Sequence, residues 1–200
     1  MPSSKRQILS AIRQQQVPAA ELPPVFSAGI VYADPVAQFR EMLSLVGGRL
    51  IIAESAAEAA AELQQLPPVQ AARMICSAFP DLCPPTVDLN NVPSPHALES
   101  VDLAILPGEF AVAENAAVWF LGARTKYRVL PFITQHLVLV VPAGQIVNNM
   151  HEAYERVRIT GAMFGTFISG PSKTADIEQS LVIGAHGARS LTVIFMPPAG

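Results

Sequence analysis

A short polar turn near the carboxyl end of the chain combines residue types that bind anions. Residues 169–174 read Ser-Gly-Pro-Ser-Lys-Thr, and we expect them to lead into a helix over about residues 174–183. The N-terminus of such a helix would present free N–H groups, to which hydroxyls and a lysine add further donors. The candidate ligand-binding residues of this turn are Ser169, Gly170, Ser172, Lys173 and Thr174.

The same turn also fits a helix that is capped and binds no ligand. Thr174 is a suitable N-cap, and Asp176 and Glu178 would already supply negative charge to the first helical turn. On spacing alone both interpretations stay open, and the capped helix is favoured. Because Asp176 and Glu178 are two positions apart, they point in different directions and make a poor metal pair.

A histidine follows this segment between two glycines. His186 lies between Gly184 and Gly187, which allow close backbone approach, so the loop can present the imidazole to a cleft. His186 is therefore a candidate catalytic residue, and Gly187 is a candidate ligand contact. His136 could also be a base, although a histidine at a strand edge is more often packed or hydrogen-bonded. We expect the 169–174 turn and the histidine loop to form one wall of a solvent-open pocket.

Strands that alternate with helices must position these residues. The expected strands cover residues 49–53, 73–77, 101–106, 136–141, 166–168 and 191–196, with one or two more in 110–121. The expected helices cover about 34–46, 55–66, 145–157 and 174–183. This order predicts an α/β fold with a mostly parallel open sheet and helices on both faces, and a cleft at the carboxyl ends of its strands.

The chain divides into an arm and a body. Residues 1–29 contain a short helix and a Pro-rich linker, and residues 30–200 form the α/β domain. Such an arm often packs on a partner subunit or covers its own domain. The partner could be a second copy of the chain in a homo-oligomer.

Composition excludes several classes of protein. The 200 residues are 50% hydrophobic and 14% charged, which is enough apolar surface for a real core. The formal net charge is −3 and no basic cluster is present, which argues against nucleic-acid binding. The longest apolar run, residues 137–143, is too short to span a membrane. No signal peptide is visible at the N-terminus, so we expect a cytoplasmic protein.

Cys76 and Cys83 are the only two cysteines. An iron–sulfur cluster takes about four ligands, so two thiols cannot hold one alone. No Cys-x-x-Cys or His-x-x-x-His spacing indicates a zinc site either. We expect two buried, reduced thiols and no cofactor or metal bound to this chain.

The string SGPSKTADIEQ at 169–179, followed by GAHGARSL at 184–191, closely resembles the C-terminal signature of the LUD-domain proteins, which act in lactate utilization. Further matching stretches follow in order, at Gly108-Glu109-Phe110, Ala113-Glu114, Leu130-Pro131, His136 and Ile146-Val147. The resemblance covers roughly residues 100–196.

This resemblance implies a fold similar to that of the sugar-phosphate isomerase and CoA-transferase group. It implies a system that oxidises L-lactate to pyruvate, with iron–sulfur clusters only in partner subunits. The chain lacks the Cys-rich segment of the B-type subunit and is therefore similar to the short C-type subunit. The implied partners are those iron–sulfur subunits. A small anionic ligand is expected separately, from the residue types of the 169–174 turn.

One loop departs from the family pattern and contains the main catalytic candidate. Many relatives have Thr-Gly-Thr or Thr-Gly-Ser after the Ala-Glu pair, where this chain has Asn115-Ala116-Ala117. In the related CoA transferases a glutamate is the nucleophile, so the resemblance makes Glu114 a candidate catalytic residue and Asn115 a ligand contact. Alternatively, Glu114 caps or hydrogen-bonds backbone at the sheet edge, which is the interpretation that we prefer for Glu109.

Three hypotheses follow. The first is a non-redox C-type subunit or accessory protein of an L-lactate oxidation system, with Glu114, Asn115, the 169–174 turn and His186 lining the cleft. The second is a stand-alone enzyme of the CoA-transferase or sugar-phosphate class, which rests on fold analogy. The third is a binding or scaffold protein without catalysis, docked through its N-terminal arm.

Overall fold

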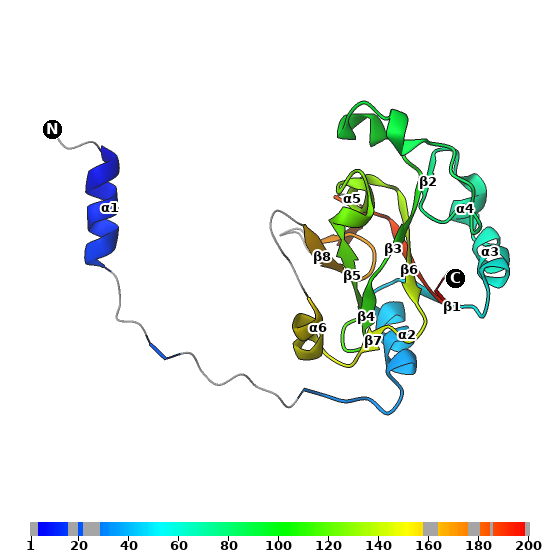
Figure 1. Cartoon of the computed structure of the whole chain (residues 1–200), viewed down its shortest axis with the longest axis horizontal. Helices are drawn as coiled ribbons and strands as arrows, with labels where there is room; N and C mark the ends of the chain where they lie inside the picture. Colours follow the sequence, from blue (N-terminus) through cyan, green and yellow to red (C-terminus); the bar gives the residue numbers. More distant parts are fainter. Residues whose placement is uncertain are drawn as a thin grey trace.

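Five parallel strands form the central sheet of the computed structural model, which describes residues 4–15, 20–21, 29–157, 164–175, 181–184 and 186–198 (Figure 1). The strands are, in spatial order, β1 (Arg49–Ile52), β11 (Ser190–Met196), β6 (His136–Pro142), β3 (Leu103–Pro107) and β2 (Ile75–Ser77). All four neighbouring pairs are parallel. The predicted α/β fold with a mostly parallel sheet is confirmed.

The sheet is buried on both faces, which explains the continuous apolar strands. Alternate residues of β6 enter different cores: Leu137 and Leu139 face one side, and Val138 and Val140 face the other. Because side chains alternate along a strand, a strand buried on both sides must be apolar at nearly every position. β6 and β11 meet this condition and lie at the centre of the sheet.

Helices cover both faces. The helices of the body are α2 (Pro35–Leu45), α3 (Ala56–Gln64), α4 (Pro67–Ala71), α5 (Leu130–Ile133) and α6 (Met150–Arg156), with the short 3₁₀ turns η1 (Leu89–Asn91), η2 (Pro95–Leu98) and η3 (Gly122–Arg124). In Figure 1, α3 and α4 lie on one side of the central sheet and α2 and α5 on the other. Asp34 caps α2 by accepting hydrogen bonds from the N–H groups of Val36 and Ala37.

A second, four-stranded sheet packs on the α2 side of the first. Its order is β7 (Ile146–Val147), β4 (Phe110–Val112), β5 (Ala117–Leu121) and β8 (Gly165–Ile168). Val118 and Phe120 enter the same core as the side chains of β6 on that face. On its other face, Phe110 and Trp119 pack with Ala153 of α6. The second sheet is therefore a covering layer with its own small outer core.

The helix predicted over residues 174–183 is wrong. Lys173–Ala175 (β9) and Leu181–Ile183 (β10) pair as antiparallel strands, and residues 176–180 lie outside the described part of the chain. Val182 and Ile183 are β-branched and suit a strand when a partner is available. A pattern of cap and acidic residues cannot distinguish a helix start from a hairpin when that partner is close by.

The helix predicted over residues 145–157 begins later than expected. Ile146 and Val147 pair with β4 as β7 before α6 starts at Met150. Asn149 is the N-cap, and its Oδ1 accepts from the N–H of Glu152 at 3.0 Å. Asparagine favours a cap over a helix interior, which explains the late start.

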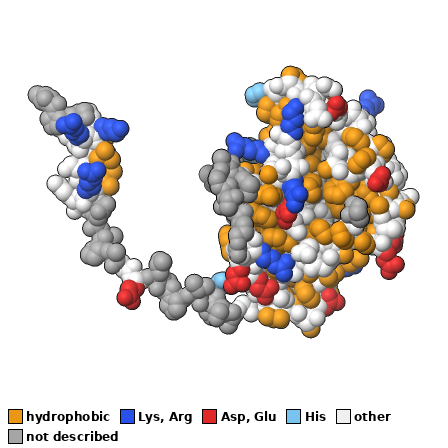
Figure 2. All heavy atoms as spheres, viewed as in Figure 1, with side chains coloured by type: hydrophobic (Ala, Val, Ile, Leu, Met, Phe, Trp, Pro, Cys, Tyr) orange, Lys and Arg blue, Asp and Glu red, His pale blue; other side chains and the backbone are white. Residues whose placement is uncertain are grey.

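The N-terminal arm is described only in part. Helix α1 (Ser4–Gln14) is present, with Ile8, Leu9 and Ile12 exposed, whereas residues 16–19 and 22–28 of the predicted linker lie outside the described residues. Within the segments that are described, no helix is both long enough and apolar enough to cross a membrane. On the face drawn in Figure 2, the basic side chains of the body lie apart from one another.

Gly108 allows the two sheets to approach each other closely where the chain passes from β3 to β4. A Cβ at this position would lie 2.5 Å from Val118 Cγ1 and 2.9 Å from Val141 Cγ2. Both distances are shorter than van der Waals contact, so a larger residue would push the layers apart.

We expect Gly108→Ala to lower the free energy of unfolding by about 1–3 kcal/mol, as overpacking of a core does. The cost should be smaller in a Val118→Ala background, because that change removes the nearer methyl group. A double-mutant cycle by chemical denaturation measures this coupling. Additive effects of the two substitutions would show that the contact does not limit the approach of the sheets.

Candidate functional site

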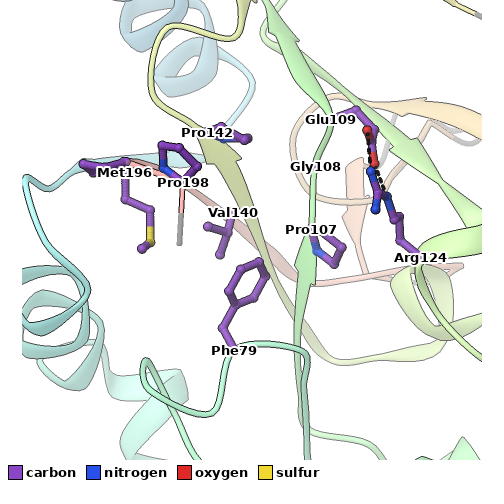
Figure 3. A pocket seen from close by; sticks show the side chains of 10 residues that line it. Phe79, Pro107, Gly108, Glu109, Arg124, Val140, Pro142, Met196 and Pro198 are labelled. Carbon is purple, nitrogen blue, oxygen red and sulfur yellow. Dashed lines mark hydrogen bonds and ion pairs between the residues drawn. The ribbon is translucent and has the colours of Figure 1, made fainter. Parts of the chain in front are cut away.

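A hollow of about 250 Å³ opens at the carboxyl ends of the central strands. Pro107, Pro142 and Met196 end β3, β6 and β11, and all three line it. Phe79, which follows β2, forms another wall (Figure 3). The sequence predicted a cleft at this edge, the usual place for ligands in open α/β sheets.

An ion pair lies at one side of this hollow. Arg124 Nε donates to Glu109 Oε1 at 2.6 Å, and Arg124 Nη2 donates to Oε2 at 3.3 Å (Figure 3). The hydrogen bond to Glu109 raises the pKa of Arg124. Because the side chain of Arg124 is 58% exposed, the pair contributes on the order of 1 kcal/mol or less to stability.

The residues that line this hollow favour ligand binding over covalent catalysis. Phe79, Val140 and Met196 supply apolar surface, and Glu109 and Arg124 are the two ionisable residues that line it. A ligand with a small apolar part and a polar end would match this surface. Glu109 was expected to have a backbone-capping role, and Arg124 was not singled out. Glu109 and Arg124 are fifteen positions apart, and no sequence pattern indicates that they pair. The pairing depends on the paths of their loops in the fold.

The 169–174 turn and the histidine loop lie side by side, as expected. The N–H of Ser172 donates to Ala188 O at 2.8 Å, and the N–H of Gly184 donates to Ser172 O at 3.0 Å. A Cβ on Gly187 would lie 3.1 Å from Ser172 Cβ. Lys173 and His186 are exposed.

These segments lie at the amino ends of the strands and do not line the hollow at the carboxyl ends. A Cβ on Gly47, just before β1, would lie 3.6 Å from Pro171 Cγ, and His186 precedes β11. The expected lining of a carboxyl-end cleft by the turn and the histidine loop is therefore wrong. A segment that leads into a parallel strand must lie at the amino end of that strand. Because residues 184–189 directly precede the strand at 190–196, the sequence alone could have placed His186 at the amino ends. With β9 in place of a helix, the turn also offers no helix N-terminus to an anion.

Glu114 lies at the start of α6. Its Oε2 accepts from the N–H of Met150 at 2.9 Å, and its own N–H donates to Asn148 O at 3.0 Å. Glu114 does not line the hollow at the carboxyl ends either. A nucleophilic role would first require release of the hydrogen bond to Met150, and this role stays a prediction.

Asn115 links its loop to the 169–174 turn. Its Oδ1 accepts from the N–H of Ala117 at 3.1 Å, and its carbonyl accepts from Ser169 Oγ at 2.7 Å. Ala116 has a φ of +54°, the left-handed region that favours glycine. The backbone at this alanine therefore has a conformation that a glycine would adopt without strain. Gly170 also has a positive φ, of +73°, and a Cβ there would lie 2.9 Å from Val46 Cγ2.

His136 belongs to a polar group at the amino ends of β3, β6 and β11. The ring Nδ1 of His136 lies 2.8 Å from Ser190 Oγ. The backbone N–H of His136 donates to the backbone carbonyl of Asp102 at 2.8 Å. The expectation of a hydrogen-bonded histidine is confirmed. Burial lowers the pKa of His136, and the nearby charge of Arg189 lowers it further. Asp102 Oδ2 accepts from the N–H groups of Arg73 and Met74, which lowers the pKa of that carboxyl.

The two cysteines are buried and free, as expected. Cys76 packs in the core on one face of the central sheet, and Cys83 packs in the core on the other. Burial raises the pKa of Cys76 to about 11 and also raises the pKa of Cys83. Thiols on opposite faces of a sheet cannot share a cluster, so these residues do not fit an iron–sulfur centre. Among the described residues, no three His, Cys, Asp or Glu side chains gather as possible metal ligands.

Comparison with known proteins relates the chain to one family. The family model of the LUD domain matches residues 95–196. Lactate utilization protein C of Shouchella clausii is 33% identical over 94 residues, which are 44% of this chain and 41% of that protein. Lactate utilization protein C of Bacillus subtilis is 30% identical over 95 residues, 44% of this chain and 40% of that protein. The match thus spans about two fifths of the length of these relatives.

A solved structure is similar in fold. A DUF162 family protein from Deinococcus radiodurans superposes with a TM-score of 0.57 over 84% of this chain and 99% of that chain, at 19% sequence identity. At this identity the likeness concerns the fold alone. It extends the agreement beyond the segment matched by the family model.

We expect both thiols to react very slowly with Ellman's reagent in the native protein. At pH 7 a pKa of about 11 leaves roughly one Cys76 in ten thousand as the reactive thiolate, and both side chains are buried. The protein unfolded in guanidinium should react at once at both thiols and release two equivalents of thionitrobenzoate. Rapid labelling of either cysteine in the folded chain would contradict the burial described here.

We expect stability to fall as the pH is lowered from 7 to 5, partly through His136. Because its folded pKa lies below its ordinary value of about 6.5, the unfolded state takes up the proton first. The contribution of neutral His136 to the free energy of unfolding is complete above pH 6.5. It is lost as the pH falls through the lower pKa of the folded state. Asp102 acts only at more acidic pH, since its folded pKa is below that of a free carboxyl.

Chemical denaturation across this pH range should show a smaller loss for His136→Asn than for the wild type. Equal pH dependence of the two proteins would show that His136 titrates normally in the folded state.

Proposed function

Because the chain belongs to the LUD domain family, we propose that it is a non-redox, C-type subunit or accessory protein of a cytoplasmic system that oxidises L-lactate to pyruvate. The observation that carries this proposal is the match of the LUD domain to residues 95–196, together with relatives named lactate utilization protein C. The match covers the central strands β3, β6 and β11 and seven of the ten residues that line the hollow at their carboxyl ends.

The cysteines support a division of labour within such a system. Oxidation of lactate to pyruvate releases two electrons, which a redox centre must accept. Cys76 and Cys83 face opposite sides of the sheet and do not fit an iron–sulfur cluster, which takes about four ligands. We therefore place the iron–sulfur clusters in partner subunits, and these subunits are the partners that we propose for this chain.

The hollow at the carboxyl ends supports a binding contribution. It is mainly apolar and has one carboxylate and one guanidinium, Glu109 and Arg124, held in a mutual pair. A guanidinium held by a carboxylate can be shared with a ligand or with a partner's side chain, since it has five N–H donors. We propose that this surface positions a ligand or partner group and that the chemistry occurs in other subunits.

The test is growth on L-lactate as the sole carbon source. In a host without a paralogue, deletion of the gene should abolish growth on L-lactate and leave growth on pyruvate intact, because pyruvate is the product of the step. Restoring the wild-type gene should restore growth. Normal growth of the deletion strain on L-lactate would remove the proposal.

The same strain tests the hollow at the carboxyl ends. A Glu109→Gln, Arg124→Gln double variant should restore growth at least severalfold more slowly than the wild type, at equal protein level. Arg40→Gln is the matched control, because Arg40 is an exposed arginine of α2 outside this hollow. Equal rescue by the double variant and the control would show that the ion pair has no part in the function.

A further inference from the structure

Helix α1 of the N-terminal arm exposes an apolar face to solvent. None of its residues is buried, and Ile8, Leu9 and Ile12 are 60%, 42% and 58% exposed. Their spacing places these three side chains on one side of the helix. A helix of 11 residues is only marginally stable alone in water, so a surface that covers this face would stabilise it. We propose that the covering surface is helix α3 of a second copy of this chain.

The charges of α1 indicate the chemistry of its partner. Lys5, Arg6 and Arg13 are the ionisable residues of this helix, which therefore has a charge of +3. Residues 30–200 contain 10 of the 13 basic residues and 15 of the 16 acidic residues of the chain, and their net charge is −5. The arm and the body have opposite charges, so the body of another copy is an electrostatically complementary partner for the arm.

Helix α3 presents the acidic surface that matches α1. The sequence from 53 to 72 contains three glutamates, Glu54, Glu58 and Glu62, and no lysine or arginine. All three are exposed and lie four positions apart, which places them along one side of the helix. Glu58 Oε2 accepts from the N–H of Glu54 at 2.8 Å. The carboxylates of Glu54 and Glu62 form no ion pair with a described residue.

The charges on the two helices have the same spacing. Lys5 and Arg13 are eight positions apart, and so are Glu54 and Glu62. Eight positions correspond to about 12 Å along a helix. When the two helices lie side by side, both ends of the basic row can therefore meet both ends of the acidic row.

The surface beside the glutamates can receive the aliphatic side chains of α1. Ala57 and Ala61 are exposed on α3, and their small side chains allow another helix to approach closely. A hollow of about 240 Å³ opens beside Glu62, and its walls include Leu50 and Leu66. The partner surface thus combines negative charge with room for apolar groups.

The point where the arm leaves the body favours a second copy over the arm's own body. Asn149 Nδ2 donates to Ile30 O at 3.0 Å, and Asn148 Oδ1 accepts from the N–H of Tyr32 at 3.0 Å, which fixes this segment beside α6. Figure 1 shows α6 and α3 on opposite sides of the body. Both sheets lie between them, because α6 packs on the outer face of the second sheet and α3 on the far face of the central sheet.

The connection from α1 to the body is short for a path around these layers. The fourteen positions from Gln15 to Gly29 span at most about 50 Å when fully extended. Three packed layers, each contributing about 10 Å, separate α6 from α3, and the arm would have to pass around them. Holding the connection nearly straight would cost conformational entropy. Two copies related by a twofold axis avoid this cost by exchanging arms, with each α1 on the α3 of the other copy.

The first test is sedimentation equilibrium of the full chain. We expect a dimer with a dissociation constant in the micromolar range or tighter. Raising the salt concentration roughly tenfold should weaken it severalfold, because exposed charges are screened. Replacing Ile8 and Ile12 by serine should weaken the dimer at least about tenfold, because the substitutions remove apolar surface from both contacts.

Two charge-reversal variants test which surfaces meet. The arm variant is Arg6→Glu, Arg13→Glu, and the α3 variant is Glu54→Arg, Glu62→Arg. Glu58 is retained because it accepts a backbone hydrogen bond. Each variant alone should dimerise at least about tenfold more weakly, because like charges then face each other. An equal mixture of the two should form a heterodimer of nearly wild-type affinity, because each arm then meets an α3 of opposite charge.

Arg40→Glu and Glu41→Arg are the matched controls, since both residues are exposed on α2, and they should dimerise like the wild type. Thermal unfolding checks that the body of each variant folds. A wild type that stays monomeric would overturn the proposal. A mixture of the two charge variants that stays monomeric would also overturn it and would place the arm on its own body or on another partner. Arm-dependent binding of monomers to phosphatidylglycerol vesicles would assign α1 to a lipid surface instead.

Discussion

The parallel hydrogen-bonded ladder β1-β11-β6-β3-β2 is the constraint on which the rest of the molecule depends. A parallel ladder requires a crossover between successive strands, so helices and covering segments must lie on both faces. The central strands are consequently apolar on both sides and pack between two separate cores. Polar chemistry is excluded from the middle of the sheet and remains at its two edges, where the strands begin and end.

The two edges differ in how their charges are balanced. At the carboxyl edge, Glu109 and Arg124 neutralise each other beside an otherwise apolar hollow. At the amino edge, Asp102 is committed to backbone N–H groups of the neighbouring segment, and Arg189 has no carboxylate partner among the described residues. The first edge therefore has a mutually neutralised pair of charges beside apolar surface. The second edge has one carboxylate and one guanidinium, which form no ion pair with each other.

The position of the family motif follows from chain direction. Residues 184–189 lead into β11, so His186 and Arg189 lie at its amino end, and the 169–174 turn is drawn there by hydrogen bonds between Ser172 and the residues before β11. Polar loop residues indicate that a site lies at the ends of the strands. They do not indicate whether it lies at the amino ends or at the carboxyl ends. In the loop Asn115-Ala116-Ala117, Ala116 has a positive φ and the carbonyl of Asn115 accepts a hydrogen bond from Ser169.

The sequence by itself determined the central strands, the parallel sheet, the buried thiols and the likeness to the LUD domain, because each of these depends on local periodicity, residue type or a contiguous string. Only the tertiary structure decided that Lys173–Ala175 and Leu181–Ile183 form a hairpin, since strand pairing depends on a partner that a one-dimensional pattern does not contain. It also decided which charges meet. The pairing of Arg124 with Glu109, and the grouping of Asp102 with His136 and Arg189, depend on sheet register and loop path, which bring distant positions to the same edge.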